Sequence, residues 1–181
     1  MYGRTAGPGD SGDDVDGRHD FDHADHVRNF DGSHIIATRL GFDVTPEVRR
    51  AVGKRSLDCL PSALSRSLRL KRDRSAAIRF VSLPEMRRLN RVYRDCDRPT
   101  DVLSFTPNAS AQMKDADYLG DIVICPAYAK REAARRAIPL QEELVRLVVH
   151  GTMHLAGWDH ERPADELRMF RVQERLVESC I

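Results

Sequence analysis

Residues 120–137, Gly120-Asp-Ile-Val-Ile-Cys-Pro-Ala-Tyr-Ala-Lys-Arg-Glu-Ala-Ala-Arg-Arg-Ala137, carry the pattern that decides the fold class. The first six residues are a short, mainly apolar run that predicts a strand. Pro126 closes this strand because proline has no amide hydrogen to donate to a sheet. A helix is expected through 127–137. The same alternation of a short strand with a helix recurs towards the N-terminus, and further helices follow towards the C-terminus.

Towards the N-terminus, further apolar runs predict strands at 102–105, 76–83 and 34–40. A helix opens at Pro84. An earlier helix begins at Thr45, where a capping hydroxyl precedes a proline at the first helical position. We expect this earlier helix to kink or break near Pro61 and to resume to about Leu70.

Towards the C-terminus, helical periodicity continues over 141–156, and Pro163 opens an amphipathic helix. That last helix carries its apolar residues in two adjacent stripes, Leu167, Phe170 and Val177 in one and Met169, Val172 and Leu176 in the other. The strands are few, short and separated by helices. The sequence therefore predicts an α+β fold, a single domain with a small sheet.

The first 34 residues differ in composition from the rest of the chain. They hold eight Asp, no Glu, three Arg and four of the seven histidines, with few aliphatic side chains. Such a composition predicts a disordered acidic N-terminal extension over 1–34, followed by the folded domain over 35–181. The folded part has a net charge of +6. A basic surface of this kind is compatible with phosphate binding, but a solvated arginine-rich face is the simpler interpretation of the charge alone.

Several classes of protein are excluded by composition. No apolar stretch approaches the roughly 18–20 residues that span a bilayer, so we expect no membrane partner. The N-terminal residues lack the apolar run of a secretory signal. The four cysteines are scattered, with no CxxC pair, which favours buried or incidental thiols in a reducing compartment over a disulfide framework. We therefore expect a cytoplasmic protein.

The candidate site lies in His150-Gly-Thr-Met-His-Leu-Ala-Gly-Trp-Asp-His160. His150 and His154 are four residues apart, so on a helix both imidazoles leave the same face, one turn apart. Gly157 can take a left-handed conformation that turns the chain back and lets His160 complete the set. Three imidazoles with an open fourth position are typical of a catalytic zinc, which lowers the pKa of a bound water to about 7. We predict one zinc per chain, or another divalent transition metal such as nickel.

These histidines allow two other interpretations. A single histidine near a helix end more often caps the helix or lies on the surface, but three at these offsets favour a metal site. The same spacing occurs in metzincin proteases as HExxHxxGxxH, where the glutamate is the general base. Gly151 stands at that position here and cannot transfer a proton. A metzincin-like metallopeptidase is therefore the alternative, not the first hypothesis.

Together with two further blocks, these residues resemble the YbeY family of metal-dependent endoribonucleases. The histidine segment is similar to the family's HGxLHLxGYDH, residues 89–105 to its LNxxYRxxDxPTDVLSF, and residues 119–122 to its LGDI. The three blocks follow the family's order, and the resemblance covers roughly residues 76–178. The departures are small: Met153 for Leu, Trp158 for Tyr, and Thr106 before Pro107.

The resemblance implies a small mixed sheet under helices and a zinc-type metal on the three histidines. It also implies single-stranded RNA as substrate, maturation of the 3′ end of small-subunit ribosomal RNA, ribosome quality control, and the small ribosomal subunit with its factors as partners. The family's arginine falls on Arg94, whose guanidinium suits the charge that builds on a phosphodiester during cleavage. Without the resemblance, a helix-end arginine paired with Asp95 or Asp97 is the better interpretation.

Some roles stay open at this point. Asp101, Asp121 and Asp159 either orient metal ligands or cap turns. Trp158 either stacks on an unpaired base or packs half-buried. A third hypothesis, a non-catalytic ribosome-assembly factor with a structural metal, needs the same residues as the nuclease.

Overall fold

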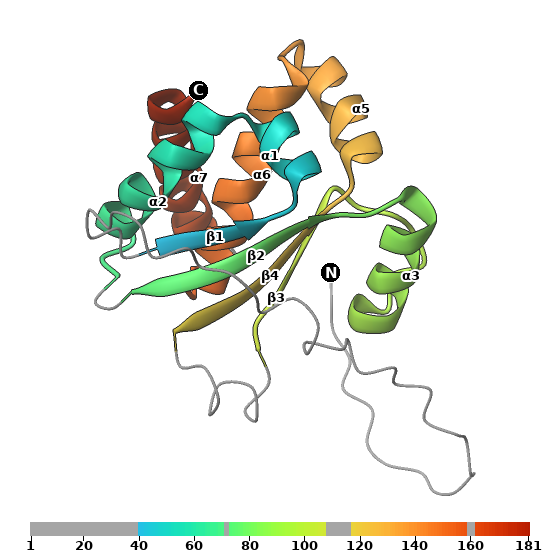
Figure 1. The fold of residues 1–181 in the computed structure, drawn as a ribbon. Coiled ribbons are helices and arrows are strands. Elements are labelled where there is room, and N and C mark those ends of the chain that lie inside the picture. The colour runs from blue at the N-terminus through green and yellow to red at the C-terminus, as the bar shows by residue number, and fades with distance from the viewer. Residues whose placement is uncertain (1–39, 71–72, 108–116, 159–161) are drawn as a thin grey trace, which may run out of the picture. The chain divides into compact units, whose positions relative to one another are not determined.

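The computed structural model describes residues 40–70, 73–107, 117–158 and 162–181. Within those residues lie four strands: β1 (Leu40–Val44), β2 (Arg74–Phe80), β3 (Val102–Phe105) and β4 (Tyr118–Ile124). The helices there are α1 (Pro46–Val52), α2 (Lys54–Ser67), α3 (Leu83–Arg94), α5 (Pro126–Arg136), α6 (Leu140–Leu155) and α7 (Pro163–Cys180) (Figure 1). The fold is α+β, as the sequence predicts.

The four strands form one mixed sheet in the order β1-β2-β4-β3. Strands β1, β2 and β4 are parallel, and β3 pairs antiparallel with β4. Strand β4 is central, and Ile122, Val123 and Ile124 on it are fully buried. A run of apolar residues therefore marks the strand that is covered on both faces.

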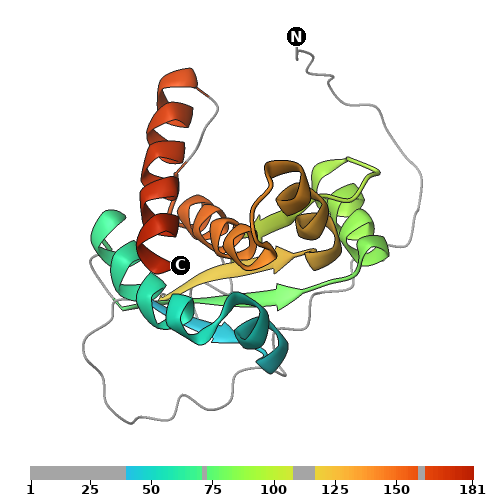
Figure 2. The same ribbon diagram turned by 90° about the horizontal axis from the view of Figure 1, so that it is seen from above.

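Helices α1, α2, α6 and α7 gather over one face of the sheet, and α3 lies apart from them beyond the end of β2 (Figures 1 and 2). Helix α6 packs on β3 and β4 and contacts α7 along its outer side. Leu144, Val145, Val148, Val149 and Met153 are buried on α6. Because α6 is surrounded by the sheet and by other helices, its position is fixed more firmly than that of a surface helix.

The helix after β1 breaks at Gly53, and of the kink or break expected near Pro61 the break does not occur. Thr45 caps α1 as predicted, accepting a hydrogen bond from the Val48 amide. Gly53 has a φ of 91°, a left-handed value that favours glycine, and it separates α1 from α2. Pro61 lies inside the continuous helix α2. Burial of Leu60 and its neighbours keeps this helix intact despite the hydrogen bond that proline removes.

Two other expectations change in detail. The first strand runs over Leu40–Val44 and meets the predicted range 34–40 only at Leu40, because residues 34–39 lie outside the described residues. On α7, Leu167 and Phe170 are exposed, although the sequence places them on an apolar stripe. The buried face of α7 is instead formed by Met169, Gln173, Leu176, Val177 and Cys180.

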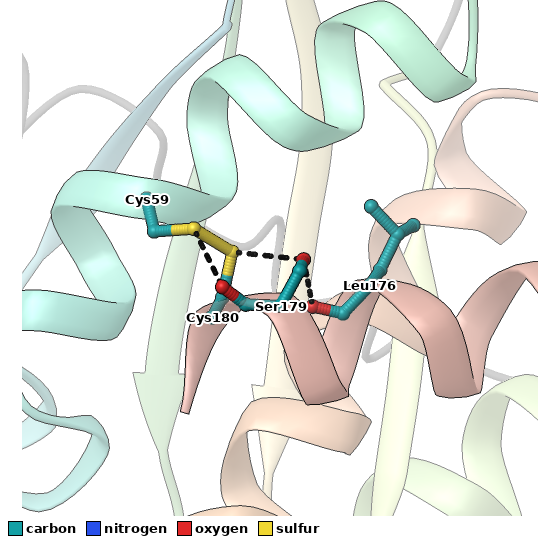
Figure 3. Close-up of a disulfide and its surroundings, with 4 residues drawn as sticks. All are labelled: Cys59, Leu176, Ser179 and Cys180. Atoms are coloured by element: carbon teal, nitrogen blue, oxygen red, sulfur yellow. Dashed lines mark hydrogen bonds between the residues drawn. A yellow bond between two sulfur atoms is a disulfide. The ribbon is translucent and has the colours of Figure 1, made fainter.

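The expectation of no disulfide is also wrong. Cys59 on α2 and Cys180 at the end of α7 form a disulfide with their Cα atoms 5.6 Å apart (Figure 3). The two cysteines are 121 residues apart in sequence, so only the packing of α2 against α7 reveals the pair. Of the described helices, none is long and apolar enough to span a membrane.

Candidate functional site

Two of the three predicted metal ligands meet at the carboxyl-terminal half of α6. The Nε2 atoms of His150 and His154 lie 3.1 Å apart, and both rings are partly buried. Two nitrogens that share a tetrahedral zinc at about 2.0–2.1 Å lie about 3.4 Å from each other. The pair therefore fits two ligands of one zinc-type ion. The same distance also suits a hydrogen bond between the rings.

The third predicted ligand, His160, and the neighbouring Asp159 lie outside the described residues. In the described part of the chain, no group of three His, Cys, Asp or Glu side chains is placed to hold a metal. The three-histidine site thus stays a prediction. The structure gives the geometry of two of its members, His150 and His154.

The turn after α6 has the conformation that the sequence predicts. Gly157 has a φ of 83°, and its amide donates to the carbonyl of His154 at 2.9 Å. The Trp158 amide donates to the carbonyl of Met153 at 2.9 Å, so the chain turns back on the last turn of the helix.

Gln173 on α7 orients the His150 ring. Its Oε1 lies 2.9 Å from Nδ1 of His150, and its own Nε2 donates to Glu174 at 3.0 Å. The second hydrogen bond fixes the amide so that oxygen faces the imidazole. Nδ1 of His150 therefore carries the hydrogen, which leaves a lone pair on Nε2 for a metal.

A partly buried ion cluster around Arg146 lies next to Gln173 and supports this arrangement. Arg146, which is 8% exposed, donates hydrogen bonds to Glu142, Glu143 and Glu174. Burial opposes the charge on Arg146, but the hydrogen bonds that it donates to its carboxylate partners outweigh burial and raise the pKa of the guanidinium. Burial likewise opposes ionisation of Glu174, yet hydrogen bonds from Arg146 and Gln173 lower the pKa of its carboxyl. Charged partners therefore hold Gln173 in place at neutral pH.

Neither Gln173 nor Arg146 is predicted as a site residue from the sequence. A signal exists for both, because Arg146 interrupts the apolar run Leu144-Val-Arg-Leu-Val-Val149 and Gln173 lies within the buried face of α7. A polar side chain in an apolar stripe needs a buried partner. Its partner cannot be named until the helices are packed.

Gly151 packs against the sheet, which bears on the metallopeptidase alternative. A Cβ at this position would lie 2.8 Å from Cγ2 of Ile122 and 3.0 Å from Oγ of Ser104. The Ser104 hydroxyl also donates to the Gly151 carbonyl at 3.3 Å. The position that carries the general base in metzincins is thus turned to the sheet here and has no room for a glutamate.

Arg94 is the last residue of α3, near the end of β3. The ring of the preceding Tyr93 contacts Phe105 at the end of β3, with ring centroids 5.0 Å apart. The Phe105 carbonyl abuts Gly120, and Leu155 of α6 lies against the same side of Gly120. The ends of α3 and α6 therefore both reach the region around Phe105.

The alternative interpretation of Arg94 as a partner of Asp97 does not hold. Asp97 accepts two hydrogen bonds from Arg87, at 2.9 and 2.6 Å, and hydrogen bonding with Arg87 lowers the pKa of that carboxyl. Arg94 is exposed and forms no ion pair with another described residue. Its guanidinium is thus available to a ligand.

The remaining candidates have local roles. Asp101 caps a turn, accepting from the Val102 amide at 2.8 Å and the Thr100 hydroxyl at 3.0 Å. Asp121 faces Arg79 at 3.8 Å. Trp158 packs half-buried against the core, with the Arg168 guanidinium 5.0 Å from the centre of its ring.

Comparison with known proteins gives consistent matches. Residues 48–180 match the family model described as "Endoribonuclease YbeY". A protein of that name from Persephonella marina is 41% identical over 95 residues, which cover 52% of this chain and only 62% of that protein. The one from Aromatoleum aromaticum is 37% identical over 134 residues, covering 72% of this chain and 84% of that protein.

One solved structure is also similar. The solution structure of TM1509 from Thermotoga maritima has 30% sequence identity and a TM-score of 0.49, and the match covers 77% of this chain and 87% of that one.

Proposed function

This chain belongs to the endoribonuclease YbeY family, and on that premise we propose that it is a zinc-dependent endoribonuclease that cleaves single-stranded RNA. The observation that carries the proposal is the 3.1 Å approach of the His150 and His154 Nε2 atoms, with Nδ1 of His150 held by Gln173. This arrangement leaves a nitrogen lone pair facing the point where an ion would bind.

In this proposal, His150, His154 and His160 hold the metal, and Arg94 meets the phosphate. When bound, zinc supplies Lewis acidity beside the scissile phosphodiester. Arg94 binds the nonbridging oxygens, because a planar guanidinium can donate two parallel hydrogen bonds to them. Gln173 and the Arg146 cluster hold the His150 ring in one orientation. Gly151 lets α6 approach the sheet closely. This close approach sets how far the imidazoles of His150 and His154 lie from the sheet.

We further propose ribosomal RNA as the physiological substrate, specifically the 3′ end of small-subunit RNA, with a role in ribosome quality control in the cytoplasm. The three sequence blocks that resemble the family support this assignment. The small ribosomal subunit and its factors would be the partners.

The experiment is incubation of the full chain, with and without added zinc, with an end-labelled single-stranded fragment of small-subunit ribosomal RNA. We expect internal cleavage that a chelator abolishes and that is lost in His154→Ala. His34→Ala, in the predicted N-terminal extension, is the matched control and should cleave normally. Equal cleavage by the unsubstituted chain and His154→Ala would refute the proposal, and no cleavage by the zinc-loaded unsubstituted chain would refute it in favour of the assembly-factor hypothesis.

A further inference from the structure

A continuous groove runs between the end of α2 and the outer side of α7, away from the sheet. It consists of two adjoining cavities of about 600 Å³ and 310 Å³. The cavities share Ser67, Val172 and Arg175 in their walls, so we treat them as one feature, the α2–α7 groove. Its lining on α7 extends from Ala164 to Ser179, which on a helix is about 22 Å.

The α2–α7 groove is strongly basic. Five exposed arginines from both walls line it: Arg66, Arg69, Arg168, Arg171 and Arg175. None of the five forms an ion pair with another described residue. The acidic residues of α7 lie outside the described lining, and one of them, Glu174, binds Arg146 instead. Among its described lining residues, the groove therefore concentrates positive charge without a compensating carboxylate.

The basic side chains of α5 provide a contrast. Arg135 pairs there with Glu132 at 2.8 Å, and Arg136 lies 3.9 Å from Glu143. Those contacts are what a solvated, charge-balanced helix face shows. The α2–α7 groove differs because its arginines surround a cavity and lack carboxylate partners among the described residues.

Apolar and aromatic groups lie among these arginines. The groove includes Trp158, with Arg168 over its ring, and Leu167, which is 67% exposed. Basic grooves that contain aromatic side chains bind single-stranded nucleic acid, because the charges follow the backbone and the rings stack on bases. Trp158 also lies four residues after His154, on the turn that ends α6. One end of the groove therefore begins beside the candidate metal site.

We propose that the α2–α7 groove binds the phosphate backbone of a single-stranded RNA on one side of the cleavage point. This inference rests on the proposed function, since it assigns the path of the same substrate beyond the metal site. The groove would add affinity for long strands and leave the chemistry at the histidines unchanged.

The test compares two matched double variants of the full chain. Arg171→Gln with Arg175→Gln removes two groove charges, and Lys130→Gln with Arg131→Gln removes two exposed charges on α5. Binding of a fluorescent oligouridine of about 16 nucleotides is followed by anisotropy, with a chelator present, at several salt concentrations. We expect the groove variant to weaken binding about tenfold and to reduce the slope of log K against log salt by about 1.4. The α5 variant should bind within about twofold of the unsubstituted chain.

Equal affinities of the two variants would overturn the inference and point instead to an acidic protein segment as occupant. No RNA binding by the unsubstituted chain would overturn it as well. If the groove variant has a lower melting temperature, Arg171→Lys with Arg175→Lys keeps the charge and should restore affinity; failure to restore it refutes the charge argument.

Cleavage, measured separately, distinguishes the two proposals. A chain that binds through the groove but cuts nothing contradicts only the proposed function, and a chain that cuts RNA but ignores the groove substitutions contradicts only this inference.

Discussion

Nδ1 of His150 on α6 lies 2.9 Å from Oε1 of Gln173 on α7, and the two residues are 23 positions apart. The amide of Gln173 is in turn fixed by Glu174, which Arg146 holds. The orientation of a predicted metal ligand therefore depends on the packing of two helices. This relationship makes Gln173 a positioning residue whose effect can be measured on metal binding alone.

Gln173→Ala should weaken zinc binding by about 10- to 100-fold, because the His150 ring loses the partner that fixes its tautomer and orientation. Competition with a chromogenic chelator measures the affinity without any RNA. Gln173→Glu keeps an acceptor opposite Nδ1 and should retain most of the affinity. Gln141→Ala, which removes a hydrogen bond to the Val52 carbonyl far from the site, is the control. An unchanged zinc affinity in Gln173→Ala would reduce this hydrogen bond to a packing role.

Arg94→Ala should lower RNA cleavage by about 10²- to 10³-fold, since one donor that stabilises charge in the transition state is lost. Metal content and melting temperature should stay nearly constant, because Arg94 is exposed and forms no ion pair with another described residue. Arg94→Lys should restore little activity, because an ammonium does not reproduce the planar fork. Arg91→Ala on the same helix should cleave normally. Full activity of Arg94→Ala would remove this residue from the site.

Gly151→Ala should destabilise the fold by about 1–3 kcal/mol, because the added methyl group meets Ile122 and Ser104 in a packed region. Denaturant unfolding gives the free energy. Ser104→Ala in the same chain removes the nearby hydroxyl and should recover part of the loss. If the changes in the free energy of unfolding caused by Gly151→Ala and Ser104→Ala simply add, the contact between α6 and β3 does not limit the size of residue 151.

Reduction of the Cys59–Cys180 disulfide should lower the free energy of unfolding by about 2–5 kcal/mol, because the bond closes a long loop in the unfolded chain. The oxidised chain should offer two thiols, Cys96 and Cys125, to alkylation in denaturant, and the reduced chain four. Cys59→Ser measured without reductant should match the reduced protein in stability. Four reactive thiols in freshly purified, unreduced protein would show that the two helices pack without the bond.

The sequence alone determined the features that depend on neighbouring residues. The start of α1 after the capping Thr45, and the start of α3 one residue before Pro84, follow from local capping and from the fixed φ of proline. The four-residue spacing of His150 and His154 places both rings on one face of any helix, and Gly157 predicts the turn that follows. These outcomes need no knowledge of what the helix packs against.

Tertiary structure decided the features that join distant segments. Pro61 stays helical because the buried face of α2 holds the helix together. The helix is interrupted instead at Gly53, which lies beside Gln141 of α6. Leu167 lies exposed beside the α2–α7 groove because the packing of α7, not its hydrophobicity, selects the buried face. The pairing of Cys59 with Cys180 and of His150 with Gln173 likewise exists only once α2, α6 and α7 come together. Sequence patterns encode periodicity and local conformation, but the identity of a partner across a helix interface is set by the packing of side chains from segments far apart in the chain.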